Sequence, residues 1–137
     1  MTTPERLVTR IALDGEAHAG DRWQVSISAV LALETADGRR VTLLDDRGWS
    51  TSGPVDMWTW TTPADLADTA RTVVGPDEPI HGESYEGMAA SHWGALASVA
   101  GAQGIAVTPD VLVALPHDVE MAPEIRERLH GRAAEGS

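Results

Sequence analysis

The fold class is decided by residues 23–45, which read WQVSISAVLALETADGRRVTLLD. Every second side chain over residues 23–33 is apolar, and Gln or Ser fills the first positions between them. This is the pattern of a strand with one buried face. Asp37-Gly38 is typical of a hairpin turn, which requires residues that tolerate positive φ. The stretch therefore predicts a β-hairpin whose return strand covers residues 40–45.

Further strands are expected on either side of this hairpin. The far end of its first strand, at Val30 and Ala32, is apolar on both faces, so we expect both faces to be covered there. Over residues 6–13 one set of alternate side chains is mainly apolar and the other contains both arginines, as in a half-buried strand; the first set is Leu7, Thr9, Ile11 and Leu13, and the second is Arg6, Val8, Arg10 and Ala12. Residues 57–61 place two Trp side chains on one face. The simplest topology for these strands is an antiparallel β-meander.

Beyond residue 61 the apolar spacing changes from a period of two to the period of a helix. Thr62, Ser84 and Thr108 stand where helices are expected to begin, as N-caps, with Pro63 and Pro109 in the first turn of two of them. The four expected helices cover residues 63–74, 85–103, 109–115 and 123–130.

Strands followed by helices predict a single α+β domain over residues 1–130. We expect an N-terminal antiparallel meander of about four strands, followed by three to four helices packed on one face of the sheet. Residues 131–137 are expected to be a disordered tail.

The composition excludes several classes of chemistry. Among 137 residues the ten basic side chains are all arginine, and Lys, Cys and Asn are absent. Without Lys there is no P-loop and no Schiff-base enzyme. Without Cys there is no disulfide, thiol nucleophile or thiolate metal site. The His and carboxylate side chains show no known ligand spacing, so no metal and no cofactor are expected.

The chain is strongly acidic, with 21 carboxylates and a formal net charge of −11. No basic residue occurs between Arg71 and Arg126. Such a charge repels nucleic acids and anionic membranes and attracts basic surfaces. No segment has the length of a membrane span, and the N-terminus lacks the apolar run of a signal peptide. A cytoplasmic location is therefore expected.

The size, the charge and the lack of catalytic motifs favour a small acidic protein-binding domain without catalysis. An immunity or antitoxin-like protein, or a regulatory accessory subunit, has these properties. We expect its partner to present a basic protein surface. The segment DDRGWSTSG at residues 45–53 is turn-like, and an exposed Trp there resembles an interface hot spot. The candidate partner-binding residues are Trp49, Arg47, Asp77, Glu78, Glu83 and Glu86.

The helix expected over residues 85–103 carries a line of small residues at a 4-3-4-3 spacing. They are Gly87, Ser91, Gly94, Ser98 and Gly101. Glycine costs about 1 kcal/mol per helix position relative to alanine, so another backbone is expected to approach closely. Packing within the domain is the simpler interpretation, and a homodimer or partner-helix contact is the other.

The alternative function is a small-molecule-binding domain or a His/Glu-based enzyme, with a Trp-lined pocket between the sheet and the helices. Glu83 is its candidate carboxylate, and its other candidate residues are His81, His92, His117 and Trp93. His117-Asp118 also has a local interpretation, as a cap or turn before the last helix. The segment GWSTSG resembles a nucleophile elbow, but its second Gly comes one position late, which argues against a hydrolase.

Overall fold

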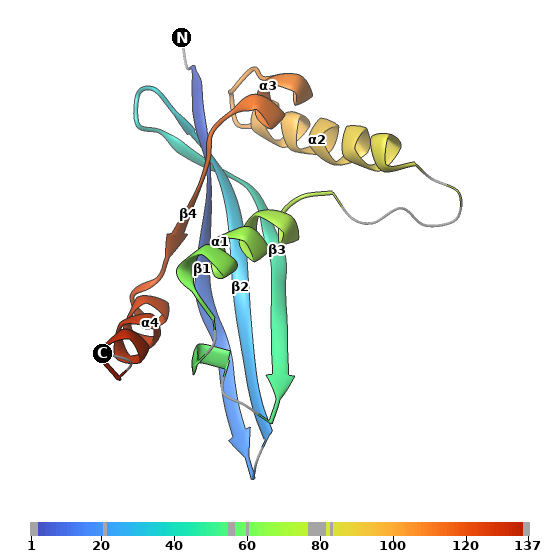
Figure 1. The fold of residues 1–137 in the computed structure, drawn as a ribbon. Coiled ribbons are helices and arrows are strands. Elements are labelled where there is room, and N and C mark those ends of the chain that lie inside the picture. Colours follow the sequence, from blue (N-terminus) through green and yellow to red (C-terminus); the bar gives the residue numbers. More distant parts are fainter. Residues whose placement is uncertain are drawn as a thin grey trace.

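The computed structural model describes residues 3–20, 22–54, 57–59, 61–76, 82 and 84–135. These residues form an α+β fold in which a sheet is followed by helices (Figure 1). In chain order its elements are β1 (Pro4–Ala19), β2 (Arg22–Thr35), β3 (Arg40–Gly53), the 3-10 helix η1 (Met57–Thr59), α1 (Pro63–Val73), α2 (Tyr85–Ala102), α3 (Pro109–Ala114), β4 (His117–Met121) and α4 (Pro123–Glu135).

The sheet has the strand order β3-β2-β1-β4. The first three strands form the predicted antiparallel meander. The Asp37-Gly38 turn joins β2 to β3, and Gly38 has a φ of 85° there. β4 comes late in the chain and pairs with β1 in parallel, with Leu7 opposite His117 and Ile11 opposite Met121. The α+β class and its N-terminal meander are thereby confirmed.

The identity of the fourth strand was predicted wrongly. Residues 57–59 form η1, and the Thr61 amide donates to the Met57 carbonyl at 3.0 Å, which closes a helical turn there. Met57 and Trp58 are adjacent and both join the same core cluster, whereas adjacent side chains of a strand point to opposite faces of the sheet. His117-Asp118, predicted as a cap or turn, begins β4 instead.

Two strands are longer than the sequence predicts, and the last helix runs beyond residue 130. β3 continues through the turn-like segment at residues 45–53 and pairs with β2 up to Gly53. Gly48 permits this close pairing, because a Cβ there would lie 2.5 Å from the Ile27 carbonyl oxygen. The glycine thus marks a tight contact between strands, not a turn.

The core lies between one face of the sheet and the helices, as predicted. Directly opposed residues of neighbouring strands share a face, so Leu7, Leu33 and Val41 line the same side. This face joins one apolar cluster with a buried residue from each helix. The helix contributions include Leu66, Ala70, Leu96, Ala100, Leu112 and Ile125.

Three helices begin at the predicted caps. Thr62, Ser84 and Thr108 each have extended backbone and accept a hydrogen bond from the amide three residues on, at 3.0–3.3 Å. Caps of this type each stabilise a protein by about 1 kcal/mol. In the part of the chain that the structure describes, no helix combines the length and apolar character that crossing a membrane requires.

The other face of the sheet is covered by charged side chains. Arg6 bonds Glu34 at 2.9 Å and Asp118 at 2.7 Å, while Arg40 bonds Glu34 at 2.6 Å and Glu120 at 3.0 Å. Arg40 belongs to β3 and Glu120 to β4, the two edge strands, so their side chains meet above the central strands. We call these five residues the arginine–carboxylate network.

This network explains two buried residues that lie outside the core cluster formed with the described helices. Val8 and Ala32 face each other across β1 and β2, on the same side as the network. Their exposed fractions are only 1% and 7%. Alkyl stems of long charged side chains cover apolar surface while their heads stay in water. The second face of β2, which was expected to be buried at Ala32, is therefore covered there by the ion-paired side chains of the network.

Acid should weaken this network through Glu34. Hydrogen bonds from Arg6 and, secondarily, from Arg40 hold the pKa of this carboxyl below its ordinary value. A lowered carboxyl pKa stabilises the fold above the unfolded value of about 4.3, and this stabilisation is lost as the pH falls through the folded-state pKa. We expect the urea midpoint to fall more between pH 7 and pH 3 in the wild type than in Glu34→Gln. Glu127→Gln, at an exposed position of α4, serves as the control and should behave like the wild type.

Candidate functional site

The helix α2 is unusual because its apolar residues are not gathered on one side. Its sequence, YEGMAASHWGALASVAGA, contains one charged residue, Glu86. All eighteen residues are described, yet only Leu96 and Ala100 are fully buried. A helix that is apolar all round is normally enclosed by protein or membrane. In Figure 1 the first half of α2 instead projects from the body of the molecule, away from the sheet.

One side of α2 is anchored to the fold. Leu96 and Ala100 enter the core, and the half-buried Trp93 packs against it. The His92 ring donates from Nε2 to the Val74 carbonyl at 2.8 Å, since a carbonyl can only accept. Just beyond the helix, Gln103 donates from its side-chain amide to the Thr42 carbonyl at 2.8 Å. These contacts fix which side of the helix is left free.

The free side carries the line of small residues. At 100° per residue, Gly87, Ser91, Gly94, Ser98 and Gly101 fall within about a quarter of the helix circumference. Gly94 is half-buried, and the other four are exposed. Apart from the backbone of the helix itself, a Cβ built at Gly94 or Gly101 would find no described atom within 4 Å. The prediction of close packing within the domain is therefore wrong for the described residues.

Further uncharged residues extend this surface. Ala95, Val99 and Ala102 lie beside the small residues on the helix and are exposed. The open face of α2 is defined here as Gly87, Ser91, Gly94, Ala95, Ser98, Val99, Gly101 and Ala102. α3 packs against α2 and exposes Val111 and Val113 as well. The open face of α2 contains no charged side chain.

Of the four acidic residues predicted to bind a partner, the structure describes one. Asp77, Glu78 and Glu83 lie outside the described residues, as does His81. Glu86 stands in the first turn of α2, where it is exposed. The one described member of the acidic set therefore lies at the N-terminal end of the open face.

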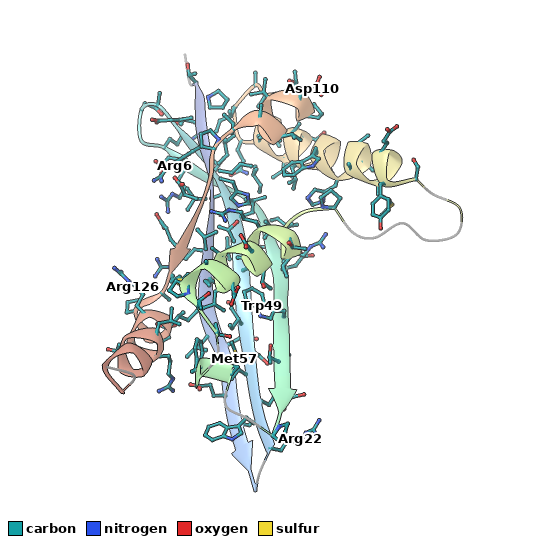
Figure 2. All side chains as sticks on the ribbon, viewed as in Figure 1. Arg6, Arg22, Trp49, Met57, Asp110 and Arg126 are labelled. Atoms are coloured by element: carbon teal, nitrogen blue, oxygen red, sulfur yellow. The ribbon has the colours of Figure 1, made fainter. Side chains whose placement is uncertain are left out.

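Trp49 and Arg47 lie in a strand. They belong to β3, opposite Ile27 and Ala29, on the face of the sheet that the helices cover. Trp49 is half-buried and packs against the core, and Figure 2 shows it beside the sheet rather than on a protruding turn. Arg47 is 3.8 Å from the Asp46 carboxylate. The turn on which the hot-spot interpretation depended is absent.

His92 and His117 have separate partners within the fold. His117 Nε2 is 2.6 Å from the Thr9 hydroxyl, whereas His92 bonds the Val74 carbonyl and makes an edge-on contact with the Trp93 ring at 5.1 Å. Burial lowers the pKa of His117, and the nearby Arg71 guanidinium lowers it further, which favours a neutral ring. Among the described residues, no three His or carboxylate groups come together as metal ligands.

A second surface was missed by the sequence reasoning. An open cleft of about 470 Å³ runs along β4 and is lined by Arg10, Val119, Glu120, Met121 and Arg126. More than a hundred residues separate Arg10 from the others, so no local pattern unites them. The only feature of the sequence that drew attention to this surface is that Arg126 ends the long stretch without basic residues.

Comparisons of the chain with protein-family models, curated proteins and solved structures found no match.

Proposed function

We propose that the protein is a small, cytoplasmic, non-catalytic protein-binding domain, of the immunity, antitoxin or regulatory accessory kind. It docks a partner protein against the open face of α2. The observation that carries this proposal is a helix face without charge, made of small residues and left in solvent by the fold. The solvent side of a helix in a soluble domain normally carries charged and polar side chains, so a long exposed face without charge favours an interaction site.

The side chains of the open face suit a helical partner. Glycine and serine leave the backbone of α2 accessible, so a second helix can approach it closely. Docking an amphipathic helix against an apolar surface is a common form of recognition, and the docking helix is anchored by residues that recur every third or fourth position. Burial of the exposed Val99 and Ala102 would add hydrophobic stabilisation.

The charge of the chain favours a partner whose rim is basic. Glu86 lies at one end of the open face, and Asp77, Glu78 and Glu83 precede it closely in sequence. Charges at the rim of an interface accelerate association more than they strengthen the final complex. The acidic segment therefore serves as the steering element of the proposed interface, and the uncharged face as its contact.

Gly94→Leu is expected to block binding while leaving the fold intact. A leucine there meets no described atom of the domain near its Cβ, and leucine favours helix by roughly 0.5–1 kcal/mol relative to glycine. The melting temperature should stay the same or rise slightly. Quantitative mass spectrometry of proteins retained from a lysate of the source cell should show a partner that wild type captures and Gly94→Leu loses.

The matched control is Ala64→Leu, which adds a leucine at an exposed position of α1. It should retain the same partner as the wild type. If the two leucine variants retained identical sets of proteins, the open face of α2 would not be the binding surface. A large drop in the melting temperature of Gly94→Leu would show instead that the face is packed within the domain.

Self-association through the same face is a second candidate, favoured by symmetry. Gly87 and Gly101 stand seven residues on either side of Gly94. In an antiparallel pair of α2 helices crossing at Gly94, each Gly87 would oppose the Gly101 of the other copy, as a twofold interface requires. Arg39 bonds the Gln103 carbonyl at the C-terminal end of α2. In the antiparallel pair this end lies beside the N-terminal end of the other copy, so Arg39 would face the side of the interface that carries Glu86. Sedimentation velocity on wild type and Gly94→Leu distinguishes this case from a different partner.

A further inference from the structure

The strand β4 forms one edge of the sheet, and part of its backbone is open. Its pairing with β1 is bounded by hydrogen bonds from the Leu7 amide to the Pro116 carbonyl at 2.8 Å and from the Ala122 amide to the Ile11 carbonyl at 2.9 Å. In a parallel ladder of this register, the even-numbered residues of β4 bond β1. The amides and carbonyls of Val119 and Met121 therefore point outward.

The open stretch of this edge is well defined. At its beginning, the His117 carbonyl already accepts a hydrogen bond from Arg71 Nε at 3.0 Å. In the residues the structure describes, the outward backbone groups of Val119 and Met121 have no partner. In Figure 1, β4 lies at the left margin of the sheet, and no described segment runs along its outer side.

The cleft along this edge holds two arginines from different elements. Arg10 reaches it from β1, on the face of the network. Arg126, which is labelled in Figure 2, reaches it from the first turns of α4. Both side chains are exposed. Glu120 also lines the cleft, but Arg40 holds both of its carboxylate oxygens, at 3.0 and 3.2 Å. Neither Arg10 nor Arg126 has an ion pair in the described part of the chain.

Two exposed guanidinium groups that form no ion pair with a described carboxylate are notable in a chain of net charge −11. The planar guanidinium group matches a carboxylate with two parallel hydrogen bonds. The net charge opposes a long polyanion such as nucleic acid, but a few carboxylates held locally by two arginines meet less repulsion. The backbone edge beside them offers hydrogen bonds that only another extended backbone uses fully.

We propose that the edge of β4 binds an extended peptide segment bearing acidic side chains. The segment adds a strand beside Val119 and Met121, and its carboxylates bond Arg10 and Arg126. Addition of a strand supplies affinity through the main chain, while side chains on alternate residues supply specificity. This surface is separate from the open face of α2, so the proposal does not depend on the proposed function.

The probe is an end-blocked heptapeptide of alternating Val and Glu, titrated into the full chain and followed by NMR and calorimetry. Binding should shift the amide signals of Val119 and Met121. Arg10→Gln and Arg126→Gln should each weaken binding about tenfold, because each removes a charge-assisted hydrogen bond. The double variant should show no measurable binding. Arg22→Gln is the matched control, an exposed arginine at the opposite end of the sheet (Figure 2), and should bind like the wild type.

Two further titrations separate the charge of the ligand from its backbone. The Val/Gln peptide should bind about tenfold more weakly than the Val/Glu peptide, and free glutarate should bind far more weakly than either. Equal binding by glutarate and the Val/Glu peptide would overturn strand addition in favour of a small-anion site. Unchanged binding in Arg10→Gln and Arg126→Gln, tighter binding of a short DNA duplex, or no binding of the peptide would each overturn the proposal.

Discussion

Replacing Leu31 with alanine is expected to lower the free energy of unfolding by about 2–5 kcal/mol. Leu31 is fully buried in β2, a central strand, where it lies opposite Thr9 of β1 and Leu44 of β3. Alanine would leave a cavity there, because neighbours on both strands are fixed by the ladder and cannot close over it. Urea denaturation monitored by circular dichroism measures the change.

The neighbouring position supplies the control for this substitution. Val30 points to the other face of β2 and is partly exposed, so Val30→Ala should have a clearly smaller effect. A cost below about 1 kcal/mol for Leu31→Ala, or equal costs for the two variants, would mean that the strand presents its faces the other way round.

Gly48→Ala is expected to destabilise the protein by about 1–3 kcal/mol through overpacking. The added Cβ would stand 2.5 Å from the Ile27 carbonyl oxygen and 3.3 Å from Ser28 Cα, both of which are backbone atoms of the adjacent strand. Backbone in a central strand cannot move aside without disturbing its own ladder. The thermal midpoint and the urea midpoint should therefore both fall.

Gly53→Ala tests the same change at the end of the same strand. A Cβ at Gly53 would find no described atom within 4 Å, so this variant should be neutral or slightly stabilising, because alanine has less backbone freedom to lose on folding. Similar losses in both variants would assign the effect of Gly48→Ala to strand propensity and not to the contact with Ile27.

Features determined by neighbouring residues were predictable from the sequence. The alternation in residues 23–33 identified β2 and its buried face, and Asp37-Gly38 located the turn between β2 and β3. Thr62, Ser84 and Thr108 marked three helix starts to the residue, because a cap is a contact within four residues of the chain. The α+β class follows from the order of these segments.

Features determined by distant residues were not predictable in the same way. β4 is only five residues long, and its partner β1 is separated from it by about a hundred residues, so its short alternation gave no signal. Trp58 is buried, but it belongs to a 3-10 helix and not to a strand. The apolar pattern of residues 57–61 indicated burial, and burial alone does not distinguish these two conformations. The Gly, Ser and Asp residues of β3 are typical of a turn, so the strand was predicted to end too early. Gly48 stands there because a Cβ at this position would collide with the backbone of β2.

The same distinction between local and distant contacts applies to the candidate binding surfaces. The small residues of α2 could be found from their spacing, but only the fold shows that a Cβ at Gly94 would meet no described atom within 4 Å outside the backbone of α2. The cleft at β4 depends on Arg10 and Arg126, which the chain brings together only through the parallel pairing. Trp49 drew attention by its residue type, and its position opposite Ile27 makes it part of the packed face.

We also expect the parallel pairing of β4 with β1 to set the order of folding events. The contacts among β1, β2 and β3 join neighbours in sequence, whereas β4 must close a loop of about a hundred residues, which is slow. Until it docks, the outer side of β1 between Leu7 and Ile11 is an unpaired strand edge, which is prone to pair with another chain. Arg6 and Arg40 find Asp118 and Glu120 only after docking, so their ion pairs retain β4 once it has arrived. We therefore expect refolding at higher protein concentration to lose more material to aggregation, because this edge of β1 stays unpaired until residues 117–121 dock.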